Sequence, residues 1–314
     1  MAAFFTLAFQ SGAQELIKLR YMPHWLHQAQ FAGYYMAKEK GIYESYGLDV
    51  EILMGGPNFP AVPVLTENRT DFTSMFLSGA IKARASGVDV VDIGQLSQRS
   101  ALLFIAKKSS GIDEPGDFNG KKIGIWRSDF QELPRAFLQK YNIQAEIFPI
   151  TSTVNLFLRG GLDIMCVMWY NEFHQVLSHG IREDELEVFA FYEHELDFPE
   201  DAIICLQSFY EDNTKACGDF ITATLEGWNY AFEHKEESLE LVLRYMKEAN
   251  IQANRAHQSW MLNRMEDIFK ADGEQMTGGL KREDYLNTAE ILKTSGTIDH
   301  FPAFEDFNKT PSQK

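Results

Sequence analysis

The first half of the chain alternates between two hydrophobic periods. Ile17, Leu19 and Tyr21 are separated by Lys18 and Arg20, and this period of two predicts a half-buried strand. Further strands are predicted from short apolar or alternating runs at 48–52, 88–93, 102–106, 122–126, 146–150, 163–169, 186–191 and 202–206. Because these runs recur throughout the first 206 residues, the chain contains enough strands for more than one sheet.

Segments of helical length separate these strands, and after residue 208 helices are predicted almost throughout. The predicted helices cover 29–40, 60–67, 79–85, 129–141, 154–158, 172–177, 218–234, 236–249, 255–270 and 282–295. Alternation of strands with helices favours α/β sheets that carry helices on both faces. The helical last third is expected to cover one lobe, and the polar tail after Phe301 is expected to fray.

Two interruptions of the pattern predict the domain organisation. The first lies at 107–117, where Gly111 and Pro115 break the alternation, and the second lies at 198–202, around Pro199. Two breaks suit a chain that leaves one lobe, builds a second and returns. We therefore predict lobe 1 from 15–106 plus 203–314, and lobe 2 from 107–202.

Composition and charge narrow the function. Of the 314 residues, 45% are hydrophobic and 24% are charged, and 29 basic against 45 acidic residues give a net charge of −16. This negative field repels phosphate backbones and argues against nucleic acid as a partner. No apolar run approaches the roughly 20 residues of a membrane-spanning helix.

The first 14 residues differ in composition from the rest. Ala2 to Phe9 is largely apolar, and small polar residues follow from Gln10 to Gln14. This order resembles the apolar core and cleavage region of a secretory signal peptide, although a basic leading region is missing. We expect 1–14 to be a signal-peptide remnant and the protein to be periplasmic; an ordinary N-terminal strand or helix is the alternative.

Three stretches together carry a family resemblance. They are Gln28-Ala29-Gln30-Phe31-Ala32-Gly33-Tyr34-Tyr35 with the later Gly55-Gly56-Pro57, then Gly120-Lys121-Lys122-Ile123-Gly124-Ile125-Trp126, and finally Gly161-Leu162-Asp163 with Trp169-Tyr170-Asn171-Glu172. In this order they resemble the periplasmic substrate-binding proteins of ABC importers related to thiamine-pyrimidine-precursor binders and to the fungal thiamine-pyrimidine synthases. Taurine, alkanesulfonate and nitrate binders are more distant relatives.

The resemblance implies a periplasmic binding protein fold of type II, with two α/β lobes, a hinge and a ligand cleft between them. Carried over position by position, it implies ligand-binding roles for Trp25, Gln30, Ser78, Gly79, Trp126, Tyr170, Asn171 and Glu172. It also implies two partners, a pyrimidine-like small molecule and an ABC permease in the inner membrane. No catalytic residue, cofactor or metal is expected.

The residue chemistry agrees with this implication. Trp25, Trp126 and Tyr170 each stand at or just after the end of a predicted strand, where open α/β sheets bind ligands. Flat rings suit stacking on a planar heterocycle. The Glu172 carboxylate could accept from an exocyclic amine, whereas it would oppose a sulfonate or nitrate. Core packing of the rings, and a surface or helix N-terminal position for Glu172, are the alternatives.

An enzyme is the second hypothesis. The fungal synthases that the chain resembles use pyridoxal phosphate and iron and carry a cysteine-rich cluster in the second lobe, where this chain offers only Cys166. The histidine pairs His24 with His27 and His174 with His179 do not have firm metal-ligand spacing. A binding protein is therefore favoured over an enzyme, and a periplasmic sensor subunit is a third possibility.

Overall fold

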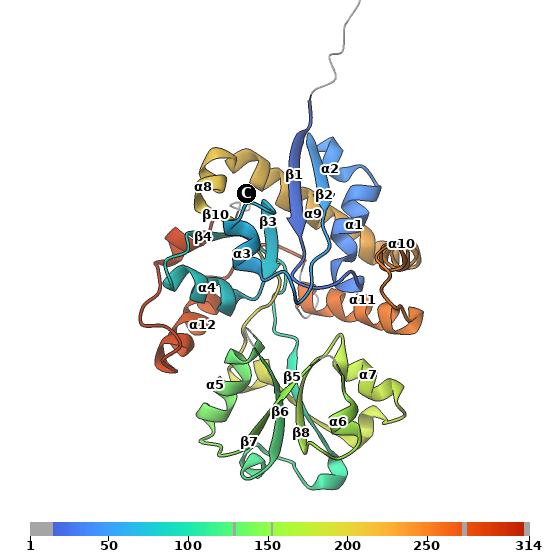
Figure 1. Ribbon diagram of the computed structural model, residues 1–314, viewed down its shortest axis with the longest axis vertical. Helices are drawn as coiled ribbons and strands as arrows, with labels where there is room; N and C mark the ends of the chain where they lie inside the picture. Colours follow the sequence, from blue (N-terminus) through green and yellow to red (C-terminus); the bar gives the residue numbers. More distant parts are fainter. Residues whose placement is uncertain (1–14, 128–129, 152, 272–274, 311–314) are drawn as a thin grey trace, which may run out of the picture.

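Two five-stranded sheets organise the computed structural model, which describes residues 15–127, 130–151, 153–271 and 275–310. The predicted signal-peptide remnant 1–14 lies outside the described residues. Figure 1 shows the two sheets in separate lobes, one above the other, with helices on both sides of each sheet. This arrangement confirms the prediction of two α/β lobes.

The strands follow the predicted positions closely. The first sheet has the order β2-β1-β3-β10-β4 and the second has the order β7-β6-β8-β5-β9. Their bounds are β1 Ile17–Met22, β2 Leu48–Ile52, β3 Phe72–Met75, β4 Val90–Gln95, β5 Leu102–Lys107, β6 Lys122–Trp126, β7 Glu146–Ile150, β8 Ile164–Met168, β9 Leu186–Ala190 and β10 Ala202–Leu206.

Helices cover both sheets, and the last third of the chain is helical as predicted. The α-helices are α1 Ala32–Glu39, α2 Ile42–Ser45, α3 Ala61–Thr66, α4 Leu77–Ala85, α5 Glu132–Lys140, α6 Asn155–Leu158, α7 Glu172–Ser178, α8 Gln207–Asp212, α9 Thr214–Glu233, α10 Lys235–Glu248, α11 Arg255–Lys270, α12 Arg282–Thr294 and α13 Phe304–Phe307. Short 3-10 turns include η1 Ala29–Phe31, directly before α1. In the described part of the chain, none of these helices has the length and apolar character to cross a membrane.

The two sheets share one topology. In each, three neighbouring strands are parallel (β2, β1 and β3 in the first sheet, β7, β6 and β8 in the second), and one antiparallel strand separates them from the last strand. That antiparallel strand is β10 in the first sheet and β5 in the second. The chain enters each of these two strands directly from the other lobe. β1 and β6 occupy equivalent places, because each is the middle one of the three parallel strands of its sheet. Their carboxyl ends carry the two tryptophans predicted to bind ligand.

Burial explains the sequence patterns. In β1, Leu19 and Tyr21 are buried, while Lys18 is exposed, as the alternation predicts. Ile17, by contrast, is 47% exposed, since it stands at the free start of the strand. β5 and β8 are buried along almost their whole length because they lie in the interior of the second sheet, and their sequences are accordingly continuous apolar runs.

The predicted first lobe boundary is wrong for one strand. A boundary at 106/107 assigns β5 to lobe 1, but β5 pairs with β8 and β9 in the second sheet. The chain therefore crosses between lobes before β5, in 96–101, and not in the glycine- and proline-containing segment 107–117. The crossing contains neither glycine nor proline, so it leaves no turn signal in the sequence.

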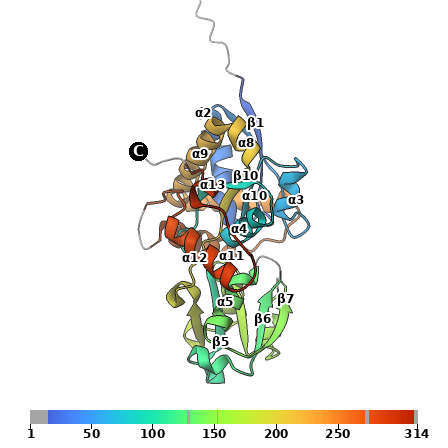
Figure 2. The same ribbon diagram turned by 90° about the vertical axis from the view of Figure 1, so that its left-hand side faces the viewer.

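The prediction that the tail after Phe301 frays is also wrong for the described residues up to 310. Phe307 in α13 is fully buried and packs against Tyr285 of α12, with ring centroids 5.2 Å apart. Beyond it, Lys309 donates its backbone N–H to the carbonyl oxygen of Asp92 at 2.7 Å. One buried aromatic ring and a backbone contact with β4 therefore hold a segment whose composition is polar. Figure 2 shows α13 lying over the first lobe.

Candidate functional site

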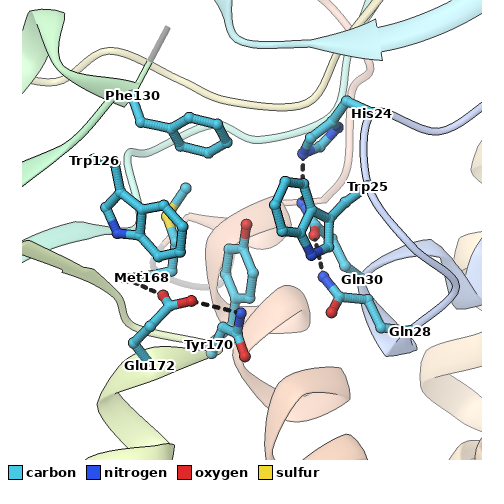
Figure 3. A pocket seen from close by; sticks show the side chains of 10 residues that line it. His24, Trp25, Gln28, Gln30, Trp126, Phe130, Met168, Tyr170 and Glu172 are labelled. Atoms are coloured by element: carbon cyan, nitrogen blue, oxygen red, sulfur yellow. Dashed lines mark hydrogen bonds between the residues drawn. The ribbon is translucent and has the colours of Figure 1, made fainter. Parts of the chain in front are cut away.

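A cleft between the two lobes encloses about 330 Å³, part of it open to solvent. It lies at the carboxyl ends of β1, β6 and β8, and Figure 3 shows its two walls. The first lobe contributes His24, Trp25, Gln28 and Gln30, and the second contributes Trp126, Phe130, Met168, Tyr170, Asn171 and Glu172. Only about 30 Å³ of this space is wide enough for the centre of a water-sized sphere, whereas small-molecule sites measure roughly 300–1,000 Å³. The lining side chains therefore close the cleft to a heterocycle until the lobes or the rings move apart.

The wall of the first lobe is the loop that leaves β1. His24 holds this loop to β3, because its backbone N–H and its Nδ1 lie 3.1 and 2.8 Å from the Ser74 hydroxyl. Trp25 follows directly and extends its ring into the cleft (Figure 3). The strand end therefore fixes the position at which the first aromatic ring enters the site.

Behind Trp25 lies a buried polar network. Gln30 of η1 accepts from Gln28 Nε2 at 2.7 Å and donates to Asp201 Oδ1 at 3.1 Å. His24 Nδ1 is 3.9 Å from the same Asp201 oxygen. Burial lowers the pKa of His24 to about 4, so the imidazole is neutral at pH 7. The first wall thus offers amides and a neutral imidazole.

The wall of the second lobe is largely aromatic. Trp126 ends β6, and its ring centroid lies 5.8 Å from that of Phe130, which in turn is 6.3 Å from the ring of Trp25 in the other lobe. The indole N–H of Trp126 is buried and makes no hydrogen bond with any residue in the described ranges. A buried donor without a partner is costly.

Glu172 provides the acidic group of the cleft. It begins α7 and is 2% exposed. Its Oε2 accepts from the backbone N–H of Met168 at 3.1 Å, and its Oε1 accepts from Asn171 Nδ2 at 2.8 Å. Burial raises the pKa of Glu172 to about 7, and the bond from Met168 opposes this rise. A donor supplied by a ligand would favour the ionised form.

The structure brings six of the eight residues singled out in the sequence to this cleft: Trp25, Gln30, Trp126, Tyr170, Asn171 and Glu172. Ser78 and Gly79 are not brought to it, because they are buried in the first turn of α4. Sequence reasoning missed His24, Gln28, Phe130 and Met168. For His24 the signal was present, since it stands between a strand end and Trp25. No three His, Cys, Asp or Glu side chains of the described residues lie together as a metal site.

Buried acids also join the two crossings between lobes. Glu200 accepts from Ser100 Oγ at 2.7 Å and from the backbone N–H of Ala101 at 3.0 Å. Its neighbour Asp201 accepts from Ser97 Oγ at 3.2 Å. Burial raises the pKa of Glu200 to about 8 and that of Asp201 to about 7. The crossing at 96–101 is therefore tied to residues 200 and 201 of the returning crossing.

These acids predict that thermal stability falls as the pH rises from 6.5 to 8.5. The folded pKa of Glu200 lies above the unfolded value, so its contribution is complete below about pH 4 and is lost as the pH rises through 8. The loss is on the order of 2 kcal/mol. The buried neutral His24 lowers stability as the pH falls, but only below about pH 6.5, so it does not affect this range. Melting temperatures at both pH values should show the fall, and Glu200→Gln should reduce it; a flat profile for the wild type would contradict the assignment.

Comparison with known proteins gives one family and a common fold. Residues 28–238 match the family model described as NMT1/THI5 like. A formylaminopyrimidine-binding protein of Halalkalibacterium halodurans is 21% identical over 253 residues, which cover 76% of this chain and 74% of that protein. The riboflavin-binding protein RibY of Chloroflexus aurantiacus is 22% identical over 253 residues, or 76% of this chain and 68% of that protein.

Among solved structures, the periplasmic aliphatic sulphonate binding protein SsuA from Escherichia coli superposes with a TM-score of 0.71. It is 15% identical, and the match covers 96% of this chain and 94% of SsuA. This likeness confirms the predicted periplasmic binding protein fold.

Proposed function

Because the chain belongs to the NMT1/THI5-like family, we propose that it is the solute-binding component of an ABC-type importer and captures a small aminopyrimidine-like heterocycle. One observation carries the proposal: Trp25 and Trp126 stand on opposite walls of a cleft that also contains the buried carboxyl of Glu172. The two rings can hold a flat ligand between them, while the Glu172 carboxylate accepts hydrogen bonds from N–H groups of the ligand. Binding of this kind requires no bond chemistry.

The chemistry of the cleft separates this ligand class from sulfonates. Among the described residues that line it, none is Lys or Arg, and the only imidazole, that of His24, is neutral at pH 7. An anion would have to approach Glu172 without a compensating cation. An aminopyrimidine instead offers an exocyclic amine to Glu172 and a flat ring to Trp25 and Trp126.

A binding protein of this fold acts by closing on its ligand. The lobes would rotate about the two crossings, and the closed form would dock on a permease in the membrane. The formylaminopyrimidine-binding relative and the periplasmic sulfonate binder support this role and an extracytoplasmic location. The importer role and the extracytoplasmic location are therefore part of the proposal, together with the predicted export signal.

Titration with 4-amino-5-hydroxymethyl-2-methylpyrimidine and with its formylamino analogue tests the proposal, with riboflavin and an alkanesulfonate as competitors. We expect calorimetric binding of the aminopyrimidines and none of the sulfonate. Binding of the sulfonate alone would contradict the ligand class. Mass spectrometry of the purified protein tests the enzyme alternative, since bound iron or a pyridoxal adduct on a lysine would favour it over a binder.

The tryptophan wall gives an optical prediction. Ligand stacking on Trp126 should quench intrinsic fluorescence, and Trp126→Ala should reduce that change because Trp126 lines the cleft, while Trp25 on the other wall keeps part of it. Trp228→Phe is the matched control, since Trp228 is fully buried against Phe232 and Phe269 in the first lobe. Equal quenching in the wild type and in the Trp126 variant would exclude this ring from the ligand.

A further inference from the structure

Beside the cleft, one chain of hydrogen bonds crosses from the first lobe to the second. His257 of α11 lies against His174 of α7, with their Nδ1 atoms 2.9 Å apart. On its other side, His257 Nε2 is 3.0 Å from Asn171 Oδ1. Asn171 then donates through Nδ2 to Glu172 Oε1 at 2.8 Å. A helix of the first lobe is thus connected with the acidic group of the second.

The chemistry of Asn171 sets the direction of each bond. Its Oδ1 can only accept, so His257 Nε2 carries a proton and donates to it. In neutral His257 the Nδ1 atom then has a lone pair and accepts from the Nδ1–H of His174. Burial lowers the pKa of His257 to about 4, and repulsion from His174 adds to this, so the neutral form is present at pH 7.

This chain lies within a wider contact between the lobes. Trp260 of α11 donates its indole N–H to the carbonyl oxygen of Trp169 at 3.1 Å. The guanidinium of Arg264 lies over both rings, 4.7 Å from the centroid of Trp169 and 4.9 Å from that of Trp260. Rotation of the lobes about the crossings would separate α11 from α7. It would therefore break the bond from His257 to Asn171.

A second donor reaches the same atom from within the second lobe. Gln175 of α7 donates through Nε2 to Asn171 Oδ1 at 3.0 Å. This bond lies inside one lobe and does not depend on the position of α11. Gln175 therefore stays bonded to Asn171 when the lobes open, whereas His257 reaches Asn171 only when the lobes meet.

We propose that His257 is a positioning residue that couples closure of the lobes to ligand affinity. In the closed form it fixes Asn171, and Asn171 orients the Glu172 carboxylate toward the ligand. In an open form this support is lost, so the acid binds a ligand less tightly until the lobes meet. The ligand part of this inference rests on the proposed function, whereas the contact between lobes does not.

Three variants at one position test this role. In His257→Gln the amide nitrogen can take the place of Nε2 and still donate to Asn171, whereas His257→Asn is too short to reach it, and His257→Ala removes both bonds. We expect the dissociation constant for 4-amino-5-hydroxymethyl-2-methylpyrimidine to rise about tenfold in the Ala and Asn variants, mainly through faster dissociation, and less than about threefold in the Gln variant. Equal affinity in all four proteins would overturn the proposal.

Gln175→Ala is the matched control, because it removes the other donor to the same oxygen without touching the lobe contact. We expect it to leave the radius of gyration in solution scattering unchanged, whereas His257→Ala should increase it. An equal loss of affinity in both variants with unchanged scattering would also overturn the coupling. If no aminopyrimidine binds the wild type, the proposed ligand class is wrong, while the scattering comparison still decides whether His257 holds the lobes together.

Discussion

Replacing Glu172 by glutamine should weaken aminopyrimidine binding by on the order of 30-fold. A hydrogen bond to a charged group contributes about 2 kcal/mol, and the amide can supply neither the charge nor the second acceptor. Because the pKa of Glu172 is about 7, wild-type affinity should also increase between pH 6.5 and 8.5 as the carboxyl ionises. The glutamine variant should lose this increase. Calorimetric titration at the two pH values measures both effects.

Thermal stability separates binding from folding in this experiment. Glutamine matches the acid in shape but can accept only one of the two hydrogen bonds that Met168 and Asn171 donate, so we expect the Glu172 variant to lose about 1 kcal/mol of stability and to remain folded in the titration. Asp92→Asn is the matched control: Asp92 is fully buried in β4 of the first sheet, does not line the cleft, and has a pKa that burial raises to about 7. If both variants lose affinity equally, the effect is not specific to the cleft.

Where the sequence alone was sufficient, the reason is that residues at the carboxyl ends of neighbouring parallel strands lie at one edge of their sheet. Trp126 and Tyr170 stand at the ends of β6 and β8 in the second sheet, and Trp25 follows β1 in the first sheet. That these two edges face each other was implied by the family resemblance, and not by the order of residues along the chain. The predicted bounds of β2, β6, β7 and β10 agree with the structure to the residue. Short, mostly apolar strands bounded by polar or turn residues gave these bounds.

The strand β3 could not be predicted because its interior is polar. Thr73 and Ser74 are buried in the middle of the first sheet, where Thr73 Oγ1 donates to the carbonyl oxygen of Met22 at 2.8 Å. Ser74 Oγ lies close to His24 and accepts its backbone N–H. Buried hydroxyl groups whose hydrogen bonds go to the backbone of a neighbouring segment carry no hydrophobic signal. The omission of β3 is also why the role of His24 in holding the Trp25 loop was not foreseen.

Contacts between residues far apart in the chain could likewise not be predicted from the sequence. Asp201 and Gln30 are 171 positions apart, and His257 and Asn171 are 86 positions apart. Each pair meets only because the chain crosses twice between the lobes. Local periodicity describes single elements and their faces, so it predicts which residues a strand end presents. It does not predict which partners the other lobe brings to them.

The glycine pair in Gly55-Gly56-Pro57 has a packing role that connects a sequence motif to the cleft. A side-chain carbon at Gly55 would overlap the carbonyl oxygen of Pro23 and lie 2.9 Å from the carbonyl oxygen of Trp25. The segment after β2 also runs beside β1, since Leu53 donates to the carbonyl oxygen of Tyr21 at 2.8 Å. Two stretches of backbone therefore meet where only glycine fits, directly behind the loop that carries Trp25.

Gly55→Ala should consequently be the most damaging single methyl addition in the first lobe. The neighbours are backbone atoms that cannot rotate away, so we expect a loss of about 3 kcal/mol of stability and a displaced Trp25. Calorimetric unfolding and titration with the aminopyrimidine measure the two effects. Gly218→Ala is the control, because nothing lies within 4 Å of the added carbon in α9, and alanine there should raise stability by about 0.5–1 kcal/mol. If Gly55→Ala loses stability but binds the aminopyrimidine with full affinity, the Trp25 loop adapts to the added methyl group. In that case ligand binding does not depend on the fixed position of Trp25.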